Sequence, residues 1–160
     1  MKDYPGKIRI VYKHYVVHPD TATTPALATC AAGRQGPGKF IEMKNAIFEK
    51  AYPTRAFTVP DMERLAAELG FDRRRFKADL GGTECAQEIA DDQSALAKVG
   101  ISGTPGFLIN GRIVFGAQPI ENFKKVIDEE LAKAAVAIGA GVKPEDYYRV
   151  AVFAPGKRSQ

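Results

Sequence analysis

Tryptophan is absent from this 160-residue sequence, and only two histidines and two cysteines, Cys30 and Cys85, are present. Two cysteines cannot staple a disulfide-dense scaffold, and two histidines form no cluster with zinc-site spacing. No apolar run approaches the roughly 18 residues of a membrane-spanning helix. The first residues, Met-Lys-Asp-Tyr-Pro-Gly, lack the apolar stretch of a secretion signal. The sequence therefore predicts a soluble chain with no metal site, no cofactor, no membrane partner and no signal peptide.

The residues that are present suffice for one sizeable hydrophobic core. Hydrophobic residues make up 45% of the chain and include nine Phe and six Tyr, so we expect a single domain over residues 1–160. The net charge is +4, but the cations are spread from Lys2 to Arg158 among 19 acidic residues. This spread argues against a nucleic-acid partner. Arg73-Arg74-Arg75 is interpreted as a solvated helix face, with nucleic-acid contact as the alternative.

The pattern of apolar residues predicts one strand, several helices, a hairpin and a further long helix. Alternation over Lys7–Tyr15 indicates the strand. Helical spacing and capping residues predict five helices, at about Thr24–Ala32, Lys39–Lys50, Pro60–Leu69, Asp72–Leu80 and, capped by Thr83 or a neighbour, up to Val99. Pro119 opens the last long helix, and the tail predicts one more.

The hairpin carries the most specific local signal. Phe107–Ile109 and Arg112–Phe115 are joined by Asn110-Gly111, the two-residue turn that twisted antiparallel strands prefer. A Thr104-Pro105 step stands directly before the first of these strands. From the residues alone, Pro105 only shapes the entrance to an edge strand.

These features together resemble the DsbA-like branch of the thioredoxin superfamily. The resemblance rests on "GISGTPGFLINGR", on the Gly-Ala-x-Pro start of the helix after it, and on the Ala-rich helix before Gln35-Gly36. It covers about residues 7–131 and leaves 132–160 as a helical tail. It implies an α/β fold, a thioredoxin-like sheet with an inserted helical subdomain, and thiol-disulfide oxidoreductase activity on extracytoplasmic, for example periplasmic, proteins.

The family's redox motif has no counterpart in this sequence. In the family, a strand and a Cys-x-x-Cys at a helix start precede the region matched here, and no Cys-x-x-Cys occurs in the chain. We therefore expect an N-terminally truncated relative or a fragment, assign no catalytic residue, and leave open whether the chain is an enzyme. The alternative is a non-catalytic thioredoxin-like peptide-binding or assembly module. A third class, the kappa-class glutathione transferases, shares the helical insertion but matches the hairpin less well.

The resemblance also implies roles for particular residues. In the family, a cis turn presents the backbone before its proline to an extended, thiol- or disulfide-containing protein substrate, which corresponds here to Gly103, Thr104 and Pro105. The residues alone leave Cys30 and Cys85 open as buried thiols, a structural disulfide or a redox pair. Relatives often pair cysteines in these two helices, so the resemblance implies that these two approach within bonding distance.

Two further expectations complete the sequence analysis. His14 and His18 with Asp20 are interpreted as surface or turn residues rather than metal ligands. In the family, the missing strand lies between the strands matched by Lys7–Tyr15 and Gly106–Ile109, so its loss leaves their edges unpaired. These edges could close on each other or pair with a second copy, and we expect a homodimer or higher oligomer.

Overall fold

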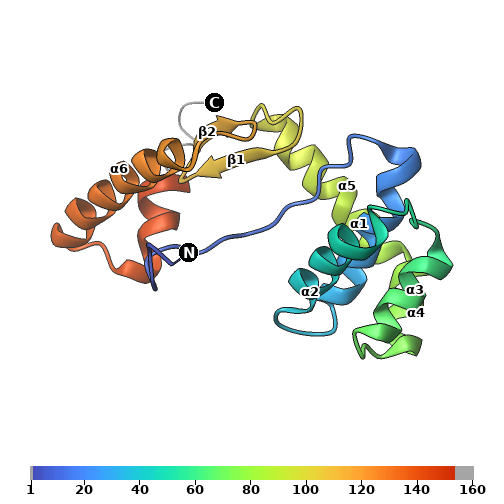
Figure 1. Cartoon of the computed structure of the whole chain (residues 1–160). Coiled ribbons are helices and arrows are strands. Elements are labelled where there is room, and N and C mark those ends of the chain that lie inside the picture. The colour runs from blue at the N-terminus through green and yellow to red at the C-terminus, as the bar shows by residue number, and fades with distance from the viewer. Residues whose placement is uncertain (1, 154–160) are drawn as a thin grey trace. The chain divides into compact units, whose positions relative to one another are not determined.

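The computed structural model describes residues 2–153 and divides the chain into two compact units. Within the described residues, one unit comprises 2–11 and 101–153, and the other comprises Tyr12–Gly100. Figure 1 gives the order of the elements along the chain. The prediction of one domain over 1–160 stays a prediction.

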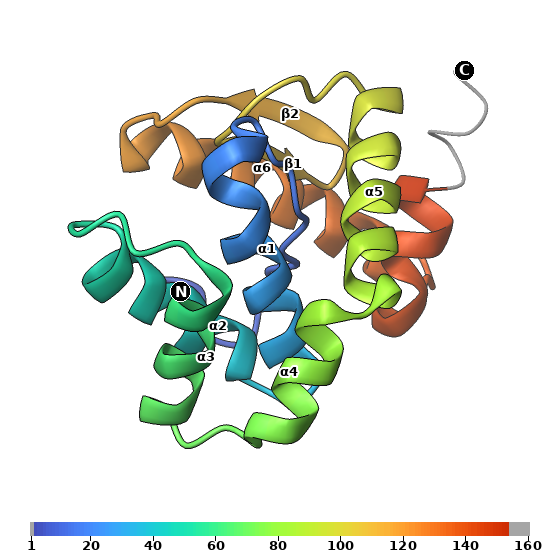
Figure 2. The ribbon, with the colours of Figure 1, turned by 90° about the vertical axis from the view of Figure 1, so that its right-hand side faces the viewer.

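The unit formed by Tyr12–Gly100 is entirely helical in its regular structure. Its elements are α1 (Pro19–Gly33), α2 (Lys39–Ala46), the π-helical turn η1 (Ile47–Ala51), α3 (Val59–Glu68), α4 (Arg73–Gly81) and α5 (Thr83–Lys98). Helix α1 contacts α2, α3, α4 and α5, and Figure 2 shows it in the middle of the group. It is the helix around which the unit is assembled.

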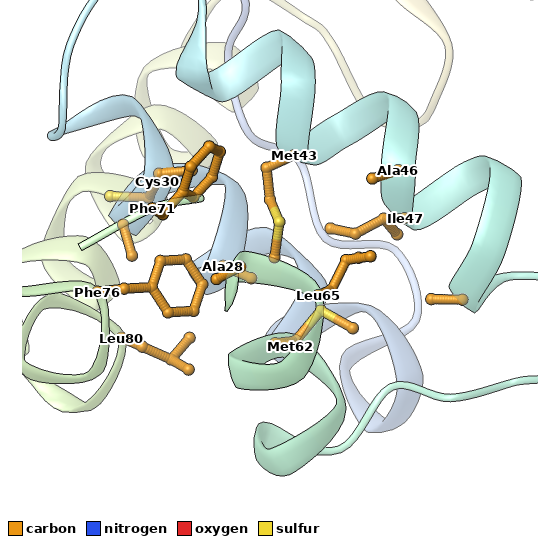
Figure 3. Close-up of a cluster of buried hydrophobic side chains, with 14 of the residues drawn as sticks. Ala28, Cys30, Met43, Ala46, Ile47, Met62, Leu65, Phe71, Phe76 and Leu80 are labelled. Carbon is orange, nitrogen blue, oxygen red and sulfur yellow. The ribbon is translucent and has the colours of Figure 1, made fainter. Parts of the chain in front are cut away.

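Small residues on α1 allow this close packing. Ala28, Ala31 and Ala32 are fully buried, and larger side chains from the surrounding helices fill the space beside them. Figure 3 shows this core around Ala28, with Met43 from α2, Met62 from α3 and Phe76 from α4. Burial of this apolar surface is the main stabilising term for the unit.

Side-chain caps mark the starts of α3 and α4. The Asp72 side chain accepts the Arg75 N–H at 2.9 Å and caps α4. Thr58 and Asp61 form a reciprocal capping box at the start of α3. The N-cap of α5 is Gly82, without a side-chain hydrogen bond, and Thr83 is the first helical residue. The first turn of α5 therefore lacks the side-chain cap that Thr83 suggested.

Two helices differ from their predicted bounds. Helix α1 begins five residues earlier than Thr24, at Pro19, and keeps Pro25 inside it. Pro19 suits the first turn of this helix, because a backbone N–H at that position would have no intrahelical partner. The segment predicted as one helix over Lys39–Lys50 is α-helical to Ala46 and continues as η1, which ends at Ala51.

The other unit contains the predicted hairpin and the predicted long helix. Strand β1 (Gly106–Ile109) pairs antiparallel with β2 (Arg112–Phe115), and both turn residues have positive φ, 47° at Asn110 and 88° at Gly111. These values belong to the type I′ turn that Asn-Gly favours. Helix α6 (Ile120–Gly139) follows Pro119, and the tail forms η2 (Pro144–Asp146) and the π-helical η3 (Tyr148–Phe153).

The prediction of a strand over Lys7–Tyr15 is wrong. Residues 8–15 have no regular secondary structure, and in the described part of the chain the sheet has only two strands, β1 and β2. A strand needs a neighbouring backbone to pair with. Side chains of α5 accept the backbone hydrogen bonds instead. The His14 N–H of this segment donates to Asp92 Oδ2 at 2.9 Å, and the N–H of Val16, the residue after the segment, donates to Gln93 Oε1 at 3.4 Å.

Candidate functional site

The segment Gly103–Pro105 leads directly into β1. Thr104 and Pro105 are exposed, Gly103 is half-buried, and the Thr104–Pro105 peptide bond is cis. Beside them, Gly106 allows a close approach, since a Cβ there would lie 3.1 Å from Ile101 Cγ2 and 3.2 Å from the Gly103 carbonyl oxygen. A larger residue at 106 would displace this turn.

The hydrogen-bond register leaves one edge of β1 open. Gly116 N–H donates to the Pro105 carbonyl at 2.8 Å, and Phe107 lies opposite Val114 in the ladder. Hydrogen-bonded pairs alternate in an antiparallel ladder, so the N–H and C=O groups of Gly106 and Leu108 point away from β2. Because β2 is the one neighbour of β1 among residues 2–153, these groups form an edge to which an extended segment can add.

One face of the hairpin is fixed to α6. The rings of Phe107 and Phe123 meet edge to face with centroids 4.7 Å apart, an arrangement that aromatic pairs favour. Arg112 pairs with Glu129 and lies 3.5 Å from Glu130. The hydrogen bond from Arg112 lowers the pKa of Glu129. The hairpin that carries the open edge is thus packed on α6.

The opposite face of the hairpin is apolar and accessible. Leu108 and Ile113 form a cross-strand pair, and with Phe115 they are 43%, 40% and 48% exposed. Alternation along a strand places these three side chains on the side away from Phe107. A segment added along β1 would find apolar side chains on this face next to the open backbone groups.

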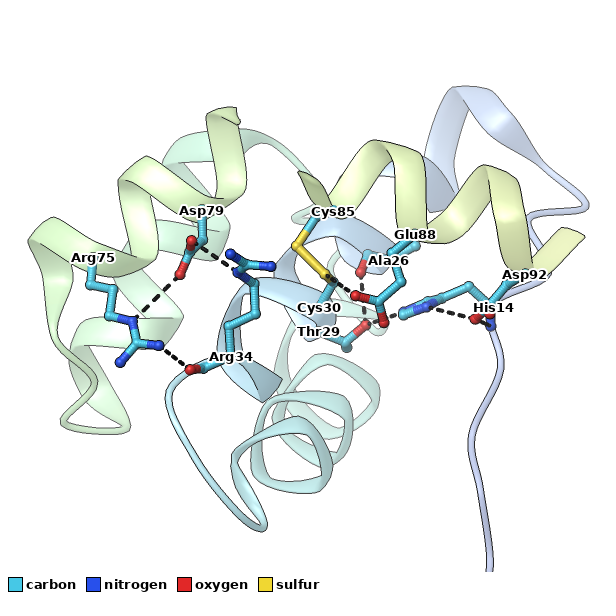
Figure 4. Close-up of a disulfide and its surroundings, with 10 residues drawn as sticks. All are labelled: His14, Ala26, Thr29, Cys30, Arg34, Arg75, Asp79, Cys85, Glu88 and Asp92. Atoms are coloured by element: carbon cyan, nitrogen blue, oxygen red, sulfur yellow. Dashed lines mark hydrogen bonds and ion pairs between the residues drawn. A yellow bond between two sulfur atoms is a disulfide. The ribbon is translucent and has the colours of Figure 1, made fainter. Parts of the chain in front are cut away.

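The two cysteines lie in the helical unit, where they form a disulfide between α1 and α5 (Figure 4). The Cα atoms of Cys30 and Cys85 are 5.8 Å apart, and the residues are 4% and 0% exposed. The pairing that the family resemblance implies is therefore present. In this state neither sulfur offers a thiolate, which is the form that attacks a disulfide.

Other sequence candidates are engaged elsewhere. The His14 ring lies 3.0 Å from Thr29 Oγ1, and within residues 2–153 no group of three or more His, Cys, Asp or Glu side chains could hold a metal ion. Arg75 donates to the carbonyl of Arg34, the C-cap of α1, and lies 3.7 Å from Asp79, one turn further along its own helix α4. The contacts of Asp92 with Lys13 and His14 could not be predicted from the sequence, because they depend on tertiary packing.

None of the helices in residues 2–153 combines the length and the apolar character that a bilayer-spanning segment requires.

Comparison with protein-family models identifies the family of this chain. The family model of the DSBA-like thioredoxin domain matches residues 3–128. The chain therefore belongs to the DsbA-like thioredoxin family, and its fold is of the α/β thioredoxin-like class, mostly helical with a small two-stranded sheet.

Two curated relatives bear the name Na(+)/H(+) antiporter. The chain is 32% identical over 141 residues to Na(+)/H(+) antiporter NhaA 3 of Salinispora tropica, covering 86% of this chain and 21% of that protein. It is 32% identical over 142 residues to Na(+)/H(+) antiporter NhaA 1 of Salinispora arenicola, covering 87% and 20%. The chain thus spans about a fifth of the length of these relatives.

Proposed function

We propose that this chain supplies the peptide-binding part of a DsbA-like thiol-disulfide oxidoreductase and that its own cysteines take no part in the exchange. Membership of the DsbA-like family supports the reaction class. The observation that supports peptide binding without thiol exchange is the burial of both cysteines in the Cys30–Cys85 disulfide. The backbone edge of β1, in contrast, has no neighbouring strand other than β2 among residues 2–153. The alternative, a peptide-binding or assembly module without thiol chemistry, uses the same edge.

The substrate class follows from that edge. An extended protein segment that carries a thiol or a disulfide would add to β1 as a further strand, beginning at Gly103, Thr104 and Pro105. Its apolar side chains would contact Leu108, Ile113 and Phe115. Family membership supports an extracytoplasmic, for example periplasmic, setting. Ion transport is not proposed, because the match covers only about a fifth of each antiporter.

Peptide binding can be mapped by NMR titration of the 160-residue chain with an extended, cysteine-blocked peptide of alternating apolar residues. We expect the largest shifts at the amides of Gly106 and Leu108, which point away from β2, and small shifts at Ile109. Leu108→Pro removes an outward N–H and should abolish the response, because proline cannot donate to an added strand. Ile113→Pro removes an outward N–H from β2 together with one of the three apolar contacts, so we expect it to weaken the response without abolishing it.

The same edge is where we propose that two copies of the chain associate in the absence of peptide. In light scattering at micromolar concentration, we expect a dimer mass that falls to the monomer mass on adding peptide or in Leu108→Pro. Shifts confined to other surfaces, or equal loss of binding in both proline variants, would contradict the proposed site. A monomer under all conditions would contradict the proposed association but not peptide binding.

A further inference from the structure

Residues Lys13–Val16 form a strap that is held on the helical unit by side chains of α5. Lys13 Nζ pairs with Asp92 Oδ1 at 2.6 Å, and the His14 N–H donates to Asp92 Oδ2 at 2.9 Å. The Val16 N–H donates to Gln93 Oε1. Asp92 is buried, so its carboxylate has lost contact with water and is stabilised by the Lys13 and His14 donors of the strap. The strap in turn has the Asp92 carboxylate as its main acceptor on α5.

The imidazole of His14 has neighbours on three helices, and Figure 4 shows it beside Thr29 of α1 and Asp92 of α5. It contacts Thr29 from α1 and the Phe40 ring of α2, with ring centroids 5.7 Å apart. Asp92 of α5 lies 3.7 Å from it, and Glu88 of α5 acts on it through its charge. Lys13 is the neighbouring cation on its own segment. Any proton that His14 gains is therefore buried among these groups.

The hydrogen-bond network assigns the proton of the neutral ring to Nε2. The Thr29 hydroxyl donates to the Ala26 carbonyl at 2.8 Å and lies 3.0 Å from His14 Nε2. A hydroxyl has one proton, so Nε2 must donate to it. Nδ1 is then an unprotonated, buried atom with no hydrogen-bond partner, 3.7 Å from Asp92 Oδ2.

We propose that His14 is an acid-sensitive latch, which is neutral when the strap is docked and releases the strap when it is protonated. A proton on Nδ1 would be too far from Asp92 for a good hydrogen bond, while the buried ring would lose its hydration. Burial accordingly lowers the pKa of His14, and this outweighs the opposing attraction of Asp92 and Glu88.

The direction of the pH effect follows from the lowered pKa. A released, solvated His14 binds a proton more tightly than a docked one, so docking is strongest above the ordinary value of 6.5. As the pH falls below it, the docking equilibrium weakens by up to about tenfold per pH unit until the pKa of the docked state is reached. The strap begins two residues after the boundary between Val11 and Tyr12, so acid would free this first stretch of the helical unit from α5.

The test follows amide hydrogen exchange at His14 and Val16 in the full chain between pH 5 and 7.5, corrected for intrinsic exchange. We expect protection of both amides to fall by about tenfold per pH unit below about 6.5, while the core amide of Ala31 stays protected. A His18→Gln background leaves one histidine, whose ring NMR titration should give a pKa below 6.5.

His14→Gln cannot be protonated and should remove the pH dependence, and His18→Gln is the matched control that should keep it. If the glutamine variant fails to dock, the ring titration in the His18→Gln background still decides. A His14 pKa above 6.5, or protection of Val16 that does not change with pH, would overturn the latch.

Discussion

Reduction of the Cys30–Cys85 disulfide is expected to lower the free energy of unfolding of the helical unit by about 4 kcal/mol. The bond closes a loop with a sequence separation of 55 residues, and in the chain-entropy model a cross-link of this span removes about that much conformational freedom from the unfolded chain. Denaturant unfolding with and without dithiothreitol measures the difference directly.

The Cys30→Ala/Cys85→Ala variant separates the cross-link from the packing of the sulfur atoms. Reduction keeps both buried sulfurs, whereas the double variant also removes them, so we expect its loss to be slightly larger than that caused by reduction. Dithiothreitol should leave the double variant unchanged. Equal stability of the oxidised and reduced chains would show that the cross-link does not stabilise this unit.

Replacing Phe76 by alanine is expected to cost the helical unit about 3–5 kcal/mol, the usual loss for a large buried ring. Phe76 is 1% exposed and belongs to the core between α1, α3 and α4. Phe48→Ala is the matched control, since Phe48 is in the same unit but 62% exposed, and we expect a change within about 0.5 kcal/mol. Equal losses of unfolding free energy in the two variants would contradict the assignment of Phe76 to the hydrophobic core.

The sequence was sufficient to predict the elements that local signals determine. Asn110-Gly111 encodes its turn through backbone conformations that these two residues tolerate, and the structure has the predicted hairpin there. Asp72 likewise marks the start of α4, because a short acidic side chain can accept a backbone N–H of the first turn. Both features depend on residues that are near in sequence.

Features that depend on distant residues were not predictable in the same way. Alternation over Lys7–Tyr15 is typical of a strand, but a strand also needs a partner. The end of the segment is held instead by Asp92, which lies 78 positions from His14 in the sequence. Asp92 is also buried only because residues distant in sequence pack around it. Spacing alone did not pair Cys30 with Cys85, and the pairing came from the family resemblance.

The candidate site was predictable only in its position along the chain. The motif around Thr104-Pro105 located the segment before β1, but the open edge depends on which strands pair, and this is a property of the folded sheet. The accessible face of Leu108, Ile113 and Phe115 also required the register.

The most direct test of the central claim measures disulfide exchange by the purified 160-residue chain. Its readouts are reduction of insulin disulfides and oxidation of a dithiol peptide, each compared with buffer and with Cys30→Ala/Cys85→Ala. We expect all three rates to be equal, because both sulfurs are buried and bonded to each other and exchange begins with an accessible thiolate. A rate above background that is lost in the double variant would contradict the claim and would make Cys30 and Cys85 the redox pair.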